Sequence, residues 1–278
     1  MADMTLLDSL LLGVIEGLTE FLPVSSTGHL ILVERWLGLH GPAVDAYSIA
    51  IQLGALFAAV VYYRDTLLAT ARGLLRSTDT DGTAARSRAL LRNLILASLP
   101  LLIVGYLFGK VIKARLFHPT TVAVALVVGG LLMLAIDWYQ RRNPPQLADG
   151  ADLSPTGALL TGIVQMMALW PGTSRSMSCI LGGQLAGLSR AAAADFAFLL
   201  ALPTLGVATL YELLKHGRDL VTTLGFAQLA VGLAVSFAVG WLVIAAFIRY
   251  LRRFGMWPFA LYRIAVGLLI LATLGRSA

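Results

Sequence analysis

The sequence predicts an all-α polytopic membrane protein with an inverted repeat, each half contributing one re-entrant helix-loop-helix and three transmembrane helices. Of its 278 residues, 58% are hydrophobic and 13% are charged, whereas a soluble domain is typically about 45–50% apolar and about 25% charged. Apolar stretches recur along the chain, and many approach the roughly 20 residues that a helix needs to cross a bilayer. A membrane barrel would instead show short strands of alternating polarity.

The first half, residues 1–140, begins with a re-entrant element over residues 6–39. This segment is long enough for two half-helices, but Pro23 and the Ser-Ser-Thr-Gly run after it break the helix in its middle. Irregular backbone at membrane depth is tolerated where protein encloses a cavity. Three plainer spans are predicted at residues 45–63, 90–110 and 119–138, with a polar, arginine-rich loop at 64–92.

Residues 141–155 form a linker, marked by Asn-Pro-Pro and Asp-Gly, and the pattern then repeats over residues 156–278. Gly162-Ile-Val-Gln165 resembles Gly13-Val-Ile-Glu16, and a second re-entrant element is predicted at 156–188. Its three spans are predicted at residues 191–212, 225–248 and 257–274. Each half crosses the membrane an odd number of times, so the second half inserts in the opposite orientation and a site is expected at the interface of the repeats.

The net charge of +6 comes from arginines in the loops, which is typical of cytoplasmic loops and excludes nucleic acid as a partner. Of the loops on the two sides of the membrane, those on the same side as residues 64–92 carry most of the basic residues. This bias places both termini and the mouth of the first re-entrant element outside the cytoplasm.

Glu16 and Glu20 are the first candidate functional residues, because their spacing places both carboxylates on one face of a helix. Acidic side chains are costly in hydrocarbon and mark functional sites in membrane proteins. Two structural alternatives remain open. The re-entrant helix could be shallow and both acids hydrated, or the acids could pair with an arginine from the other half.

The hydroxyl residues Ser25, Ser26 and Thr27 follow the helix break. Any one of them could simply cap the returning half-helix, since serine and threonine are favoured N-caps. His29 lies three residues beyond Ser26, on the same face if this stretch is helical. A serine, a histidine and two carboxylates at a helix break contain the components of an activated nucleophile.

The second break, Pro171-Gly-Thr-Ser-Arg-Ser176, precedes another apolar helix. Small residues before a helix leave backbone N–H groups free to hold an anion, and Arg175 could clamp phosphate oxygens. The alternative is a capped half-helix with Arg175 paired to Glu16 or Glu20. Arg263 in the last predicted span is either a second phosphate ligand or a structural counter-ion. The predicted substrate-binding residues are Ser25, Thr27, Gly172, Thr173, Ser174, Ser176 and Arg263.

Both broken-helix motifs give the sequence a close resemblance to the undecaprenyl-diphosphate phosphatase, or bacitracin-resistance, family. The strongest match is Glu16-Gly-Leu-Thr-Glu20-Phe-Leu-Pro-Val-Ser-Ser-Thr-Gly-His29, followed by the 171–176 motif. The resemblance covers nearly the whole chain. It implies that Glu16, Glu20, Ser26, His29 and Arg175 are catalytic. One departure is Cys179, which stands where the family's second motif usually reaches a threonine.

The resemblance also implies where the protein acts and what it binds. It implies a bacterial inner-membrane enzyme that removes the terminal phosphate of undecaprenyl diphosphate on the periplasmic side and so recycles the lipid carrier for peptidoglycan synthesis. A divalent cation, Mg²⁺ or Ca²⁺, would be held by Glu16 and Glu20. The expected partners are a polyprenyl diphosphate lipid and membrane lipids, and a homodimer is left open.

Two mechanisms and one rival function fit these residues. Ser26 attacks with the aid of His29 or Glu20 and forms a phosphoseryl intermediate, or an activated water attacks directly while Ser26 binds phosphate. Inverted repeats with buried carboxylates are also typical of transporters, so a lipid flippase or an ion-coupled transporter is the alternative. A transporter does not require a serine–histidine pair beside a phosphate cradle, which favours the phosphatase.

Overall fold

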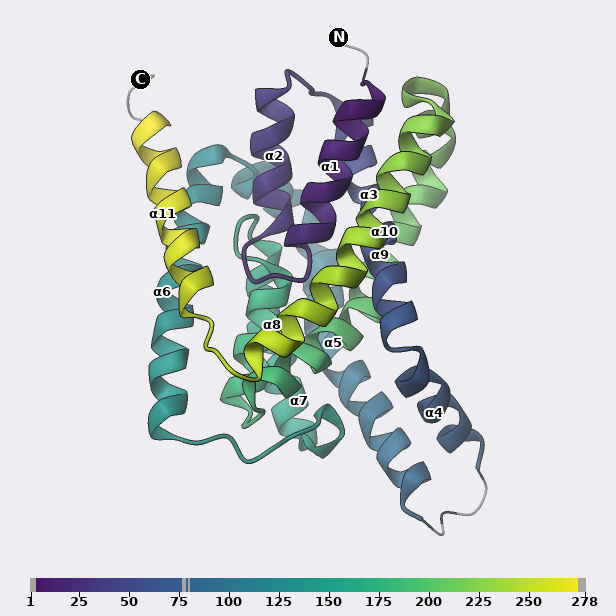
Figure 1. The fold of residues 1–278 in the computed structure, drawn as a ribbon, viewed down its shortest axis with the longest axis vertical. Helices are drawn as coiled ribbons and strands as arrows, with labels where there is room; N and C mark the ends of the chain where they lie inside the picture. Colours follow the sequence, from purple (N-terminus) through teal and green to yellow (C-terminus); the bar gives the residue numbers. More distant parts are fainter. Residues whose placement is uncertain (1–3, 77–78, 80, 275–278) are drawn as a thin grey trace.

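The computed structural model describes residues 4–76, 79 and 81–274 (Figure 1). Over these residues the chain forms helices and no strand. The helices before the linker are α1 (Leu6–Thr19), α2 (Ser26–Trp36), α3 (Pro42–Tyr62), α4 (Arg64–Leu75), α5 (Thr83–Leu116) and α6 (Pro119–Arg142). After it come η1 (Gly150–Asp152), α7 (Pro155–Gln165), η2 (Met166–Leu169), α8 (Arg175–Leu185), α9 (Arg190–Leu224), α10 (Phe226–Leu251) and α11 (Trp257–Leu274).

In the described part of the chain, five helices are long and apolar enough to cross a membrane: α3, α5, α6, α9 and α10. The prediction of an all-α polytopic membrane protein is therefore confirmed. The sixth predicted span, at 257–274, forms α11, which is apolar but shorter than the other five. The division into two repeats stays a prediction, and its ends at residues 1–3 and 275–278 lie outside the described residues.

The prediction of a polar loop over 64–92 is wrong, because helices occupy much of it. Helix α4 follows α3 directly, and α5 begins at Thr83, seven residues before the predicted span. The carboxylate of Asp79 explains the early start of α5, since it accepts hydrogen bonds from the N–H groups of Ala84 and Ala85 at 3.0 and 2.7 Å. A side chain that satisfies the free N–H groups of the first turn stabilises a helix start.

Two pairs of short helices meet inside the bundle. In Figure 1, α1 and α2 descend from the end that carries both termini, whereas α7 and α8 enter from the opposite end. Ser25 and Ser174 are the N-caps of α2 and α8, and their hydroxyls accept from the N–H groups of Gly28 and Met177. These two serines are the non-glycine residues with positive φ in the described chain, at 74° and 77°. Such strained backbone is typical of functional sites.

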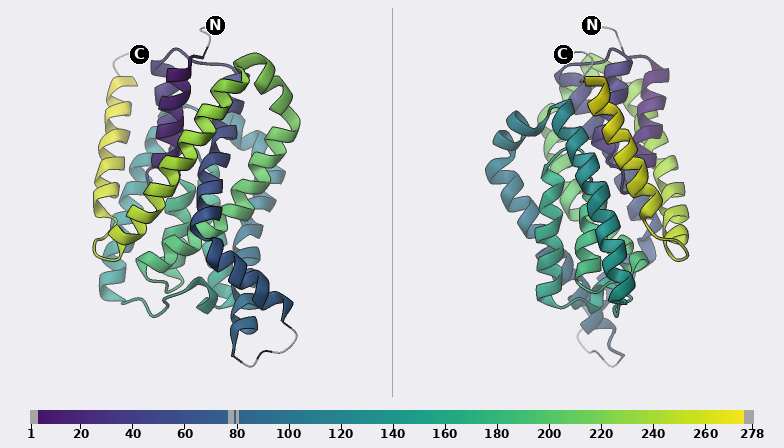
Figure 2. Two further views of the ribbon diagram at one scale, coloured as in Figure 1. Left: turned by 45° about the vertical axis from the view of Figure 1, so that its right-hand side comes forward. Right: turned by 90° about the vertical axis from the view of Figure 1, so that its left-hand side faces the viewer.

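Close glycine contacts set the position of the acidic helix α1. A Cβ on Gly17 would lie 2.8 Å from the carbonyl oxygen of Ser236 in α10, and a Cβ on Gly54 of α3 would lie 2.3 Å from that of Leu233. Small residues allow membrane helices to approach at backbone distance. Figure 2 shows α10 running obliquely along α1 and α3. Helix α10 therefore fixes α1, which ends at the turn before α2, relative to α3.

Candidate active site

The turn between α1 and α2 brings a carboxylate and a hydroxyl into direct contact. Glu20 ends α1 and Ser26 begins α2. The Ser26 hydroxyl donates a hydrogen bond of 2.6 Å to Oε2 of Glu20. Both residues are 7% exposed. A buried hydroxyl that donates to a carboxylate is arranged to lose its proton to that carboxylate when it attacks an electrophile.

Arg175 of α8 joins the second turn to the first. Its Nη2 lies 2.9 Å from Oε1 of Glu20, and its Nη1 donates to the carbonyl oxygen of Ala197 in α9 at 3.0 Å. The alternative in which Arg175 pairs with an acid of the first half is therefore present in this structure. Its Nε is buried without a hydrogen-bond acceptor among the described residues. This N–H is a donor that remains available to a ligand.

A cavity of about 130 Å³ lies between the two turns. The N-termini of α2 and α8 both face it, because their caps Ser25 and Ser174 line its wall. Two helix N-termini that converge on one cavity form a favourable site for a polyanion such as a diphosphate. The lining residues are Glu20, Ser25, Ser26, Thr27, Gln52, Ala168, Trp170, Pro171, Gly172, Ser174, Arg175 and Leu205.

Glu16 lies one helical turn before Glu20 and is fully buried. Neither of its carboxylate oxygens has a hydrogen-bond partner among the described residues. No group of three or more histidine, cysteine or acidic residues in the described chain could hold a metal ion by itself. Magnesium, however, commonly uses only one or two carboxylates together with substrate phosphates. Glu20 lines the cavity and Glu16 does not, so a cation held by both carboxylates and completed by substrate oxygens stays a prediction.

The His29 ring forms hydrogen bonds with Ser25 and Tyr262 rather than with Ser26. Its Nδ1 lies 2.8 Å from the carbonyl oxygen of Ser25 and its Nε2 lies 2.7 Å from the hydroxyl of Tyr262 in α11. Since a carbonyl only accepts, Nδ1 carries the proton, and Nε2 of the neutral ring accepts from Tyr262. The two rings are parallel, with centroids 5.7 Å apart. The expected serine–histidine pair is therefore not formed in this structure, and Glu20 is the partner of Ser26.

Arg263 is fully buried between the two turns. Its guanidinium donates at 2.9 Å to the carbonyl oxygens of Pro23 and Gly172, one in each turn. It also donates to the carbonyl oxygens of Ala125 and Leu126 in α6. Arg263 is not among the residues that line the cavity. This geometry makes Arg263 a positioning residue that ties both turns to α6, and its role as a phosphate ligand stays a prediction.

We expect Arg263→Gln to destabilise the protein by about 3 kcal/mol or more, because the shorter amide leaves buried carbonyl groups unpaired. Thermal unfolding in detergent measures this effect. Arg253→Gln removes the same charge from an exposed position after α10 and should unfold at the wild-type temperature. An Arg263→Gln protein of wild-type stability with only a raised KM would contradict the positioning role.

Two predicted residues of the second turn are buried behind the cavity wall. The Ser176 hydroxyl donates to the carbonyl oxygen of Phe21 at 2.7 Å, which ties α8 to the first turn. Thr173 is 4% exposed and is not a lining residue. Cys179 is also fully buried outside the cavity, while the Ser178 hydroxyl donates to the carbonyl oxygen of Ser174 at 2.9 Å. The Ser176 contact supports the position of the first turn.

Sequence reasoning missed several lining residues. Gln52 comes from α3 and Leu205 from α9. Trp170 also lines the cavity, and its ring N–H donates to the carbonyl oxygen of Thr121 at 3.1 Å. Gln52 had a detectable signal, because it is an amide inside an otherwise apolar span. Leu205 had none, since its place at the cavity depends on how α9 packs.

The chain is similar to known proteins along most of its length. Residues 9–269 match the family described as bacitracin resistance protein BacA. An undecaprenyl-diphosphatase of Sorangium cellulosum (strain So ce56) is 55% identical over 266 residues, covering 95% of this chain and 85% of that protein. An undecaprenyl-diphosphatase of Polaromonas naphthalenivorans (strain CJ2) is 44% identical over 270 residues, covering 96% of this chain and 95% of that protein. This chain therefore belongs to the BacA family of bacitracin resistance proteins.

Proposed function

We propose that this protein is an integral membrane phosphatase that hydrolyses undecaprenyl diphosphate to undecaprenyl phosphate and inorganic phosphate. The family membership and the names of the relatives support this assignment. The observation that carries it is the contact of Ser26 and Arg175 with the same carboxylate, Glu20, at a cavity faced by two helix N-termini. A flippase or ion-coupled transporter would not need a hydroxyl bonded to a carboxylate at an anion cradle.

The reaction starts with the diphosphate in the cavity, held by the first-turn N–H groups of α2 and α8 and by Nε of Arg175. Ser26 Oγ attacks the terminal phosphorus while Glu20 takes its proton. The bond from that phosphorus to the bridging oxygen breaks, and undecaprenyl phosphate leaves. Glu20 passes this proton to the departing phosphate and is a carboxylate again. Water then attacks the phosphoserine while Glu20 takes a proton from it. The bond from phosphorus to Ser26 Oγ breaks, Glu20 returns the proton to Oγ, and inorganic phosphate leaves. Arg175 keeps Glu20 oriented toward Ser26 and offsets the negative charge.

A divalent cation, Mg²⁺ or Ca²⁺, completes the site in this proposal. Glu16 and Glu20 would hold it, and it would neutralise charge on the phosphate oxygens when bound. The unpartnered carboxylate of Glu16 supports this role, because a fully buried carboxylate without a hydrogen bond is costly in its charged form, and a bound cation would offset that cost.

We further propose that the protein lies in the bacterial inner membrane. The diphosphate would reach the cavity from the periplasmic side, and the prenyl chain would lie in the bilayer. The arginine-rich end of the molecule, opposite both termini, supports this orientation through the positive-inside rule. The enzyme would then return the lipid carrier to peptidoglycan synthesis, and removal of undecaprenyl diphosphate would reduce the target of bacitracin.

Purified protein in detergent, supplied with a polyprenyl diphosphate, is expected to release inorganic phosphate. EDTA should abolish the release, and added Mg²⁺ or Ca²⁺ should restore it, because two carboxylates and a diphosphate repel one another without a cation. A colorimetric phosphate assay measures the rate. Folded wild-type protein that releases no phosphate with any divalent cation would refute the proposed function. Full activity in EDTA would refute the cation site.

A further inference from the structure

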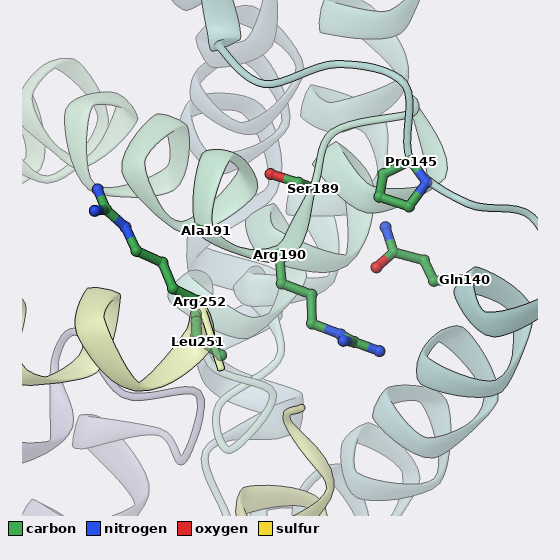
Figure 3. Close-up of a pocket in the computed structure, with 7 residues that line it drawn as sticks. All are labelled: Gln140, Pro145, Ser189, Arg190, Ala191, Leu251 and Arg252. Atoms are coloured by element: carbon green, nitrogen blue, oxygen red, sulfur yellow. The ribbon is translucent and has the colours of Figure 1, made fainter. Parts of the chain in front are cut away.

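A second cavity lies at the end of the molecule opposite both termini (Figure 3). Its volume is about 330 Å³, larger than that of the candidate active site. It lies where α6 ends, α9 begins and α10 ends. Its lining residues are Gln140, Pro145, Ser189, Arg190, Ala191, Leu251 and Arg252. None of them contributes to the proposed reaction.

The cavity lies at the level where membrane meets water. The three helices that surround it are membrane spans, and each one begins or ends at the cavity. Exposed aromatic side chains gather at the same helix ends: Trp138 and Phe254 are both 55% exposed. Arg142 lies over the ring of Trp138 at 4.0 Å. Aromatic and basic residues at the ends of spans mark the depth of the lipid headgroups.

The cavity carries more positive than negative charge. Nη2 of Arg190 pairs with Oδ1 of Asp137 at 2.7 Å, and Arg141 reaches the same carboxylate at 3.4 Å. One carboxylate thus faces two guanidinium groups. Nε of Arg190 is buried and has no acceptor among the described residues. The local excess of cationic donors favours an anionic ligand.

Arg252 adds a further guanidinium on the opposite side of α9. Figure 3 shows its side chain extending away from that of Arg190. Arg252 is exposed. The nearby carboxylate of Asp195 already accepts a hydrogen bond of 2.6 Å from the Tyr63 hydroxyl. Arg252 is therefore an exposed cation at the rim of the cavity.

The first turn of α9 contributes donors of its own. Ser189 precedes the helix, and its hydroxyl oxygen accepts from the N–H of Ala192 at 3.3 Å. The N–H groups of Arg190 and Ala191 come before any intrahelical acceptor, as in every helix start. With the arginine side chains, these groups surround the cavity with donors suited to phosphate oxygens.

We propose that this cavity binds the phosphate of an anionic glycerophospholipid from the surrounding bilayer. Basic pockets between membrane helices at the headgroup level are suited to such lipids, and Leu251 and Pro145 provide the apolar side of the lining. The bound headgroup bridges the ends of α6, α9 and α10. Helix α9 also holds Arg175 through the carbonyl oxygen of Ala197, so the lipid steadies the helix that positions the active-site arginine.

Native mass spectrometry and thermal unfolding of the purified full chain in detergent test this site. The probes are short-chain phosphatidylglycerol, short-chain phosphatidylcholine and inorganic phosphate, each titrated separately. Phosphatidylglycerol should bind and raise the unfolding temperature at concentrations where the other two do not. Arg252→Gln should weaken phosphatidylglycerol binding about tenfold, the loss of one charge-assisted phosphate contact. Arg253→Gln is the matched control, since Arg253 is exposed and does not line the cavity, and it should bind as wild type.

Each other outcome would overturn the proposal. Equal binding of phosphatidylcholine would mean that the cavity does not select anionic lipid. Equal protection by inorganic phosphate would assign the site to a soluble anion. Equal loss in Arg252→Gln and Arg253→Gln would mean that only general surface charge attracts the lipid. Because the readout is binding and stability, a failure here is distinct from a failure of the proposed phosphatase.

Discussion

Ser26→Ala is expected to lower kcat for phosphate release at least about 10⁴-fold, since it removes the nucleophile. In wild-type protein, rapid denaturation during turnover should trap a phosphoryl group on Ser26, detectable by peptide mass spectrometry. The hydroxyl has no other hydrogen-bond acceptor than Glu20 in the described chain, so its removal should leave the fold intact.

Ser178→Ala is the matched control for this change. It removes a buried hydroxyl from α8 that donates only to the carbonyl oxygen of Ser174 and does not line the cavity. Its kcat should stay within a few-fold of wild type. If Ser26→Ala retained a tenth or more of the wild-type rate and no phosphoserine were trapped, attack by water would replace the serine mechanism.

Glu20→Gln is expected to lower kcat about 10³-fold, because the amide accepts no proton from Ser26 and no longer balances the charge of Arg175. The side chain keeps its shape and can still accept a hydrogen bond from Arg175. The buried charge of Arg175 is left uncompensated, so some stability is lost as well. The rate is therefore compared at a temperature where thermal unfolding in detergent shows that the variant is folded.

Glu34→Gln is the matched control, because Glu34 is also a buried carboxylate and lies in α2, the helix that follows Glu20. Glu34 is 9% exposed and bonded to the Ser48 hydroxyl, away from the cavity. Near wild-type activity is expected for it. If Glu20→Gln were as active as Glu34→Gln, then Glu20 would not be the base. His29→Gln should then be compared, since His29 was the other candidate from the sequence.

Much of the fold could be predicted because its causes are local. Long apolar stretches predict membrane helices, and Pro23 with the serines after it predicts the break between α1 and α2. The early start of α5 was missed because it depends on Asp79 reaching backbone N–H groups five and six residues further on.

The hydrogen-bond partner of Ser26 could not be predicted from the sequence either, because it too depends on contacts across a turn. Spacing along a helix pointed to His29, but Ser26 is the first residue of α2, and its hydroxyl reaches back to Glu20 across the turn. His29 is instead bonded to Tyr262, which is 233 residues away in the sequence. Sequence patterns report neighbours within one helix, and the internal repeat indicates that the two breaks come together, but neither identifies Tyr262 as the partner of His29.

The sequence by itself determined which side chains are chemically suited to the site: two acids, a group of hydroxyls and an arginine at two helix breaks. Tertiary structure decided how they pair. Arg175 meets Glu20 across 155 residues, and Arg263 meets Pro23 across 240. These pairings follow from the packing of complete helices, where close backbone contacts such as that of Gly17 with Ser236 set the distances. Composition identifies costly buried groups, and packing alone selects the partner that stabilises each one.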